Sequence, residues 1–258
     1  MCGRYSSTKN PARLAADFDA VDATGTDAPD ADYNVAPTKK VFSVVQRRSS
    51  DADDDQDNAE RSIRVMRWGL VPKWAKDPSI GNRMINAKSE TVTTKPAFRG
   101  AIKYHRCLLP ADGWYEWKRD AGRKFPYFMT PADGAGLALA GIWATWRDPR
   151  DDQAPPLTTC SVLTTSAVGS LIEIHERMPL LLPRSAWTQW LDPSLHDVSE
   201  LLVPPSPALV ADLELRPVAS TVNNVRNNGP ELVEPVPDEE LPPMPERVSL
   251  DREHGKPG

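Results

Sequence analysis

Residues 63–68 alternate between apolar and polar with a period of two, as is typical of a half-buried β-strand, and several other short, largely apolar runs are strand-like. Glycine, proline and aspartate are common between these segments and favour turns there. The predicted strands cover residues 41–46, 63–68, 103–109, 113–118, 125–130, 137–143, 157–165 and 213–218. Strands and long helices do not alternate regularly. We therefore expect an α+β fold, a single domain with a barrel-like, mainly antiparallel sheet flanked by short helices.

Helical patterns are short and depend on capping residues. The pair Asn10-Pro11 is a favoured N-cap and first helical residue, and it predicts a helix over residues 12–20. Leu14 and Phe18, four residues apart, would form its apolar face. Further short helices are predicted from a cap at Ser166 to about residue 174, over residues 186–191 after a cap at Ser185, and over residues 197–202.

Composition changes at two places along the chain of 258 residues. Residues 49–60 are acidic and of low complexity, and proline and charge dominate after about residue 234. We expect one domain over 1–235 with an acidic loop insertion at 49–60, followed by a disordered tail at 236–258. No stretch of about 18 apolar residues and no secretory signal pattern occurs, so a cytoplasmic protein without membrane association is expected.

The chain has three cysteines, an odd number without the spacing of a zinc site. Cys107 and Cys160 lie in apolar, strand-like runs, and both are expected to be small core residues. We expect no disulfide framework, no metal site and no organic cofactor.

Net charge is −5, which argues against a nucleic-acid partner until the distribution is considered. Residues 61–124 contain fifteen Lys and Arg against five Asp and Glu. Trp68, Trp74, Trp114 and Trp117 lie in the same stretch. Cations suit phosphates and aromatic faces suit unstacked bases, so this pattern is compatible with single-stranded nucleic acid. A solvated basic face over core tryptophans explains it equally well.

Cys2 is the strongest candidate for chemistry. Removal of Met1 would leave a cysteine whose α-amine (pKa near ~7.7–8.0) and thiol (pKa near ~8.5) stand on adjacent carbons. Such an aminothiol condenses with an aldehyde to an imine, and the thiol then closes a five-membered thiazolidine. An internal cysteine lacks the free amine. An accidental early cysteine is the plain alternative.

Three other residues are candidates, each with a structural alternative. Glu116 lies between aromatic residues on a predicted strand, where a raised pKa would suit a general acid; it could instead face water. His175 lies at the end of the predicted Ser166 helix, where it could transfer protons or be purely structural. Asn86 could orient a substrate or amine, or could cap a helix.

Six segments in order resemble one family, the SOS response-associated peptidase (SRAP) family, whose members process abasic sites. The segments are residues 1–5 (MCGRY), 33–38 (YNVAPT), 67–74 (RWGLVPKW), 85–90 (INAKSE), 112–117 (DGWYEW) and 174–179 (IHERMP). The resemblance implies binding of single-stranded DNA with an abasic site and a covalent crosslink through Cys2. It implies that Asn86, Glu116 and His175 complete the catalytic set, and that the protein acts as a monomer in the DNA damage response.

The same resemblance implies a set of DNA contacts. They are Arg4, Asn34, Pro37, Trp74, Lys88 and Thr164. The family often has arginine where this chain has Lys88, which keeps the charge but loses the bidentate fork. The acidic insertion and the tail lie outside the family core.

Two other functions stay open on the sequence. The family name suggests a cysteine peptidase or self-processing hydrolase with Cys2 as nucleophile and His175 or Glu116 as base. A non-catalytic module for single-stranded DNA would need Cys2 only as a structural residue. An imine that does not close to the thiazolidine would permit β-elimination, so an abasic-site lyase side activity is also compatible.

Overall fold

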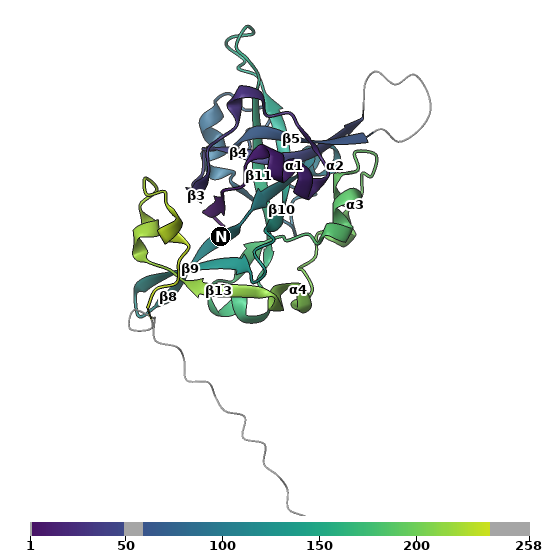
Figure 1. Cartoon of the computed structure of the whole chain (residues 1–258). Coiled ribbons are helices and arrows are strands. Elements are labelled where there is room, and N and C mark those ends of the chain that lie inside the picture. Colours follow the sequence, from purple (N-terminus) through teal and green to yellow (C-terminus); the bar gives the residue numbers. More distant parts are fainter. Residues whose placement is uncertain (1, 49–58, 238–258) are drawn as a thin grey trace, which may run out of the picture.

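The computed structural model describes residues 2–48 and 59–237 of the chain. Two sheets form most of the molecule, and short helices lie around them (Figure 1). The strands are β1 (Tyr5–Ser7), β2 (Val21–Asp22), β3 (Asp32–Val35), β4 (Lys40–Arg48), β5 (Ala59–Trp68), β6 (Asn86–Lys88), β7 (Arg106–Ala111), β8 (Gly113–Asp120), β9 (Arg123–Pro131), β10 (Leu137–Trp146), β11 (Leu157–Ser166), β12 (Arg177–Pro179) and β13 (Leu213–Pro217).

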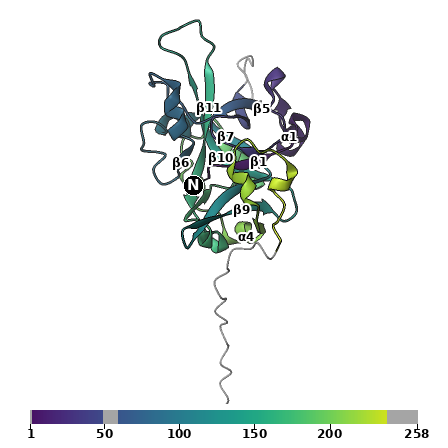
Figure 2. The ribbon, with the colours of Figure 1, turned by 90° about the vertical axis from the view of Figure 1, so that its left-hand side faces the viewer.

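Five strands of the larger sheet close into a ring. β4 pairs with β5 and, where Val44 faces Leu108, with β7; β7 pairs with β10, and β10 with β11. The ring closes because β11 also pairs in parallel with β5, so that Cys160 lies opposite Trp68. The hairpin between β10 and β11 projects beyond the ring (Figure 2). Closure of this kind leaves these strands without a free edge.

The smaller sheet carries the start of the chain. Its strand order is β13-β9-β8-β1-β3, and β1 runs antiparallel to β8 with Tyr5 opposite Trp114. The Tyr115 backbone N–H donates to the Arg4 carbonyl oxygen at 2.9 Å, which continues the ladder toward the terminus. Extending this register places Gly3 opposite Glu116. The sheet therefore holds the residues next to Cys2 against the middle of β8.

Alternation along the ring strands separates two apolar clusters. Val41 and Val45 of β4 belong to a cluster with Trp68, Trp114 and Tyr5, which joins the ring to the smaller sheet. The intervening residues of β4, Phe42 and Val44, belong to a second cluster that packs against the helices. Tyr5 meets Trp68 edge-on at 5.2 Å between ring centroids. This packing anchors β1 on the ring beside Cys2.

Helices are short. The α-helices are α1 (Pro11–Phe18), α2 (Arg99–Tyr104), α3 (Trp187–Leu191) and α4 (Pro207–Ala211). Helices α1, α2 and α3 pack in the second cluster, whereas α4 packs in the first. Single 3-10 turns are η1 (Gly25–Asp27), η2 (Pro78–Arg83), η3 (Gly169–Glu173), η4 (Arg184–Ala186), η5 (Ser199–Leu201), η6 (Ser220–Asn223) and η7 (Pro230–Leu232). The predicted first helix is confirmed: the Arg13 N–H donates to Asn10 Oδ1 at 2.8 Å, and Leu14 and Phe18 are buried.

The predicted helix from Ser166 is wrong. Ser166 ends β11, where it pairs with Arg177 of β12, and only the 3-10 turn η3 follows. Pairing with a distant strand overrides the local capping preference here. Ser185 likewise does not cap α3, because it lies inside η4 and the helix begins after Ala186.

Two other boundaries differ from the sequence pattern. Residues 103 and 104 belong to α2, so the strand expected from 103 begins only at Arg106. Residues 197–202 form no α-helix, only the turn η5, with Asp197 Oδ1 accepting from the Ser199 N–H at 3.0 Å. In both places a few apolar residues fit helix and strand periods alike.

The predicted fold class is confirmed: the molecule is α+β, mostly sheet with few short helices, and its main sheet is ring-like. The acidic insertion predicted at 49–60 lies outside the described residues except for 59 and 60, which begin β5. The tail predicted at 236–258 also lies outside them except for its first two residues.

Candidate functional site

Cys2 lies in the core rather than at a frayed end. Its side chain is fully buried, in the cluster that joins the ring to the smaller sheet. Burial raises the pKa of the Cys2 thiol, and the charge of Glu116 raises it further. The thiol is therefore held protonated at neutral pH, with the Glu116 carboxyl group within electrostatic reach.

Asn86, from a strand that pairs with the ring, forms a hydrogen bond with the Cys2 backbone. It begins β6, which pairs in parallel with β11 so that Asn86 lies opposite Val162. Its Nδ2 donates to the Cys2 carbonyl oxygen at 2.7 Å. Its Oδ1 is buried and accepts no hydrogen bond from the described residues. The reading of Asn86 as a helix cap is therefore wrong, and a buried acceptor remains beside the chain terminus.

Glu116 provides an acid close to neutral pH. The carboxyl group lies on β8 opposite Tyr127 and is only 3% exposed. Burial raises its pKa from 4.5 to about 7, although the positive charge of the chain's amino terminus opposes the shift. The alternative that Glu116 faces water is wrong, because the strand buries it. At pH 7 about half of the molecules would carry the proton.

His175 lies between η3 and β12, not at the end of an α-helix. Its Nδ1 accepts from the Arg177 backbone N–H at 2.9 Å. Partial burial lowers the pKa of His175, and the positive amino terminus lowers it further. A neutral imidazole whose Nδ1 accepts a hydrogen bond carries its proton on Nε2. His175 can therefore donate from Nε2 toward its surroundings.

These four residues come from segments far apart in the chain. Asn86 contacts Cys2 directly, the Glu116 charge acts on the Cys2 thiol, and the amino terminus acts on both Glu116 and His175. The site thus combines a buried thiol next to the chain terminus, an acid that titrates near neutrality, and a neutral imidazole. Such a set can transfer protons while an amine and a thiol attack one carbon.

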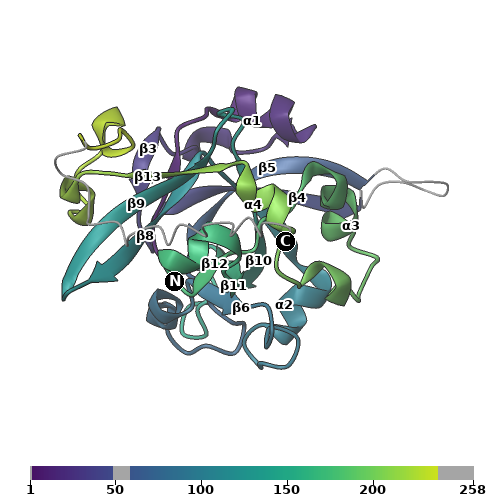
Figure 3. The same ribbon diagram turned by 90° about the horizontal axis from the view of Figure 1, so that it is seen from below.

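A cationic edge adjoins this group. Lys88 of β6 is exposed and lies opposite Thr164 of β11. Figure 3 shows β6, β11 and β12 side by side at this edge. From β12, Arg177 Nη2 donates to the Thr164 carbonyl oxygen at 2.6 Å and to a Glu90 carboxylate oxygen at 3.0 Å. Thr164 itself is buried, and Lys88 carries the outward charge.

Sequence reasoning did not single out Arg177 and Glu90. Both lie in segments already noted for other residues, Glu90 in INAKSE and Arg177 in IHERMP. Their pairing becomes visible only when β6, β11 and β12 lie side by side. The opposite charges of Glu90 and Arg177 were the one signal in the sequence that could have indicated this pairing.

The exposed Trp74 and the half-buried Pro37 belong to loops. Trp74 follows β5 in the loop before η2, and its side chain is 59% exposed. Gly69 and Gly81 fix this loop, because a Cβ on Gly69 would lie 2.6 Å from the Gly81 carbonyl oxygen. Pro37 lies in the turn between β3 and β4. An exposed indole on a fixed loop is suited to stack on an unpaired base.

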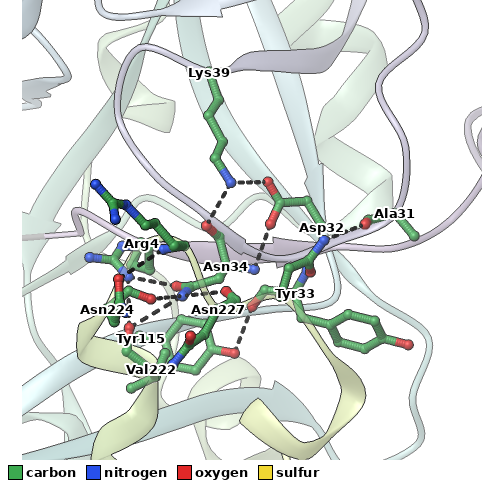
Figure 4. Close-up of polar contacts among 12 residues, drawn as sticks. Arg4, Ala31, Asp32, Tyr33, Asn34, Lys39, Tyr115, Val222, Asn224 and Asn227 are labelled. Atoms are coloured by element: carbon green, nitrogen blue, oxygen red, sulfur yellow. Dashed lines mark hydrogen bonds and ion pairs between the residues drawn. The ribbon is translucent and has the colours of Figure 1, made fainter.

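Arg4 and Asn34 belong to one hydrogen-bonded network, in which Asn34 is buried and Arg4 is half-buried (Figure 4). Arg4 Nη1 donates to Asn34 Oδ1 at 2.6 Å and to the Val222 carbonyl oxygen at 2.9 Å. Asn34 is fully buried, and its Nδ2 donates to the carbonyl oxygens of Val222, Asn224 and Asn227. These bonds hold the segment after η6 against β1 and β3. The structure therefore buries Asn34, which the sequence analysis expected to contact DNA.

Cys107 and Cys160 are buried in the ring, as predicted, and burial raises the pKa of both thiols. Within 2–48 and 59–237, no group of three or more His, Cys, Asp and Glu side chains lies where it could hold a metal ion. In the same part of the chain, no helix has both the length and the apolar character needed to cross a membrane.

Comparisons with known proteins agree with this arrangement. The chain is 34% identical over 235 residues to the abasic site processing protein YoqW of Bacillus subtilis, covering 91% of this chain and 99% of that protein. It is 31% identical to the abasic site processing protein YedK of Escherichia coli, covering 92% and 100%. A match to the abasic site processing protein HMCES of Gallus gallus has 32% identity and covers 92% and 78%.

A solved structure and a family model extend the comparison to the fold. A protein from Bacteroides thetaiotaomicron superimposes with a TM-score of 0.76 at 25% identity, covering 91% of this chain and all of that one. The model described as SOS response associated peptidase (SRAP) matches residues 1–225. The matched range contains Cys2, Asn86, Glu116 and His175. This chain belongs to the SOS response associated peptidase (SRAP) family.

Proposed function

We propose that this protein processes abasic sites: it binds single-stranded DNA at such a site and, after loss of Met1, forms a covalent thiazolidine crosslink through Cys2. One observation carries the proposal. The buried Cys2 is held by Asn86 beside a carboxyl group with a pKa of about 7, at the only position where a thiol can neighbour a free α-amine. The names of the relatives support the substrate.

The reaction needs one group that both gives and accepts a proton. The Cys2 amine adds to the C1′ aldehyde of the opened deoxyribose. Protonated Glu116 then donates its proton to the resulting hydroxyl group, which leaves as water and yields an iminium ion. The Glu116 carboxylate next removes the thiol proton, and the sulfur attacks the iminium carbon. The thiazolidine forms, one water leaves, and Glu116 regains its proton.

The raised thiol pKa fits this order of events. A protonated thiol competes poorly with the amine for the aldehyde, so the imine forms first. His175, through its Nε2–H, would stabilise the sugar oxygen as the ring opens. The unused Oδ1 of Asn86 would accept a hydrogen bond from the freed amine. Slow thiol closure would leave time for β-elimination, so a lyase side reaction belongs to the proposal.

DNA would lie along the cationic edge beside Cys2. Lys88 and Arg4 would contact phosphates, Trp74 would stack on a base, and Pro37 and Thr164 would shape the path of the strand. We propose a monomer acting in the cytoplasm on damaged DNA. No step uses a metal or an organic cofactor.

The test is denaturing electrophoresis of the Met1-processed protein mixed with single-stranded DNA carrying one abasic site. A heat-stable shifted band is expected, absent with intact DNA and absent with Cys2→Ala. Cys2→Ser keeps the amine and should give only a transient imine, which borohydride can trap. Cys160→Ala removes a different buried thiol and should crosslink normally. An equally stable band from Cys2→Ser would exclude the thiazolidine.

The peptidase alternative is separable in the same samples. A cysteine peptidase needs a thiolate beside a cationic imidazole, whereas here the thiol pKa is raised and the His175 pKa is lowered. Hydrolysis of peptides without DNA, lost in Cys2→Ala, would favour the peptidase and contradict this account.

A further inference from the structure

Cationic side chains gather around a tryptophan on the ring, outside the group around Cys2. Arg47, Arg64, Lys73, His105 and Trp143 are called here the Trp143 cluster. The pairing of Val44 with Leu108, extended along β4, places Arg47 in line with His105. The Trp143 N–H donates to the His105 carbonyl oxygen at 2.8 Å. β4, the start of β7 and β10 therefore present three members side by side.

The Trp143 ring contacts both Arg47 and His105. The Arg47 guanidinium carbon lies 4.9 Å from the Trp143 ring centroid, and the His105 ring centroid lies 4.6 Å from it. The indole is 8% exposed, while Arg47 reaches solvent. A guanidinium over an indole face keeps its donors free at the rim. The ring thus holds Arg47 in place without using its hydrogen-bond donors.

The positive charge of the cluster is not neutralised by the described residues. Arg47 and Lys73 form no ion pair and no side-chain hydrogen bond in 2–48 and 59–237, and Arg64 bonds only to Ser62 Oγ, at 3.1 Å. Glu60 lies opposite Arg47 in the register but makes no ion pair with it.

The cations also act on one another. Burial lowers the pKa of Arg47, and the nearby Arg64 lowers it further. Burial likewise lowers the pKa of His105, and the positive charges of Lys73 and Arg47 lower it further. Arg47, Arg64 and Lys73 are three like charges that form no ion pair with the described residues, and such a group is typical of a surface that binds an anion.

The cluster is continuous with the proposed DNA site. Lys73 immediately precedes Trp74, the exposed indole expected to stack on a base. A strand that leaves the abasic site past Trp74 would next meet Lys73 and the rest of the cluster. Phosphates recur along the strand at a spacing that separate cations can follow.

We propose that the Trp143 cluster binds the phosphates of the same DNA strand several nucleotides away from the abasic site. The inference rests on the proposed function and adds to it a second, sequence-independent contact. It assigns the cluster no part in the chemistry, so crosslinking to a strand too short to reach it should not depend on Arg47 or Arg64.

The test compares two lengths of single-stranded DNA, one of about seven nucleotides and one about three times longer. Both carry a tetrahydrofuran abasic analogue, which cannot crosslink, and binding is followed by fluorescence anisotropy at several salt concentrations. Arg47→Gln/Arg64→Gln is compared with Arg13→Gln/Arg184→Gln, which removes the same charge from exposed positions on α1 and η4. Arg47→Gln alone avoids disturbing the Ser62 contact, and Arg47→Lys keeps the charge.

The long strand should bind the unmodified protein about tenfold more tightly than the short one, and Arg47→Gln/Arg64→Gln should lose most of this gain. For this double variant on the long strand, the slope of log binding constant against log salt concentration should become shallower by about 1–1.5. Arg47→Lys should keep most of the gain, and the control pair should keep it fully. Equal affinities and slopes for the cluster and control variants would overturn the proposal.

Failure of the proposed function has a different signature. In that case the unmodified protein forms no stable adduct even with a short strand carrying a true abasic site. Normal adduct formation there, combined with an unchanged response of the cluster variant to strand length, would overturn the second contact alone.

Discussion

Two asparagine side chains lie beside the start of the chain, and they differ in how fully their hydrogen-bonding groups are used. Asn34 accepts from Arg4 and donates to three backbone carbonyls. Asn86 donates to the Cys2 carbonyl oxygen while its buried Oδ1 accepts nothing from the described residues. Beside it, the Glu116 carboxyl group is buried with a pKa raised to about 7.

The difference separates a structural role from a chemical one for the same type of side chain. A saturated buried amide stabilises the fold, because each bond replaces one to water and none is left over. An unused buried acceptor and a desolvated acid both destabilise the fold, and such features cluster at functional sites. Asn34 therefore stabilises the fold, whereas Asn86 and Glu116 have the features expected of the proposed site.

The largest expected effect comes from Glu116→Gln. This variant keeps the shape but cannot transfer a proton, so the crosslinking rate should fall by about 10²–10⁴-fold. The mechanism needs both a protonated acid and a neutral amine, so the rate of the unmodified protein should fall on the alkaline side as Glu116, with a pKa of about 7, loses its proton. Quenched time courses between pH 5.5 and 8.5 would show this fall in the crosslinking rate, and the Glu116→Gln variant should lack it. A variant with the full rate and the same profile would remove Glu116 from the mechanism.

The same substitution should stabilise the fold at alkaline pH. The folded-state pKa of about 7 lies above the ordinary value of 4.5, so the folded protein holds the proton more tightly. Stability from this group is present below about 4.5 and is lost as pH rises through 7. Glu116→Gln should therefore raise the free energy of unfolding at pH 8 by about 2–3 kcal/mol, less any hydrogen bond it loses. Urea titrations at pH 5 and pH 8 would measure it.

Asn34→Ala should affect stability instead of chemistry. It leaves three carbonyl groups and the Arg4 guanidinium short of partners, so the free energy of unfolding should fall by about 2–4 kcal/mol. Asn228→Ala, which removes two exposed contacts to Tyr33 and Ala31, is the matched control and should cost about 1 kcal/mol or less. Crosslinking by the folded fraction of Asn34→Ala should stay close to normal. A crosslinking defect without a stability loss would reverse the assigned roles.

Lys88→Ala should give the smallest effect. Lys88 is exposed and contributes one charge beside the reactive network, so its loss should weaken DNA binding by about tenfold or less. The slope of log binding constant against log salt concentration should become shallower by about 0.7–0.9, as expected for the loss of one phosphate contact. Lys88→Arg should bind at least as tightly, because the guanidinium can form bidentate bonds. Anisotropy with the tetrahydrofuran strand is suitable, and an unchanged slope would exclude a phosphate contact.

Local patterns were enough for elements that depend on their own residues. Helix α1 follows from the Asn10 cap and the Leu14–Phe18 face, and β4, β8 and β10 follow from short runs rich in apolar and aromatic residues. Local patterns failed to predict the secondary structure where pairing with a distant strand determines it. Ser166 has a good capping side chain, but pairing with β12 keeps it in a strand.

The candidate site divides in the same way. The chemistry of Cys2 and of Glu116 among aromatic residues can be read from neighbouring residues, because both depend on covalent structure and local composition. Asn34 and Asn86 cannot be distinguished by such reading, since each is a lone asparagine in a motif. Their roles depend on whether carbonyl groups from the segment after η6 reach them, and this is a long-range contact.

By itself, the sequence determined the fold class, the first helix, the motif residues and the candidate aminothiol, since these depend on periodicity, local capping and covalent connectivity. Only the tertiary structure decided that β5 and β11 close the ring, that Asn34 is saturated while Asn86 keeps a free acceptor, and that Arg47 stacks on Trp143. The physical reason is that burial, desolvation and hydrogen-bond partners are set by residues far away in the chain, which no local pattern encodes.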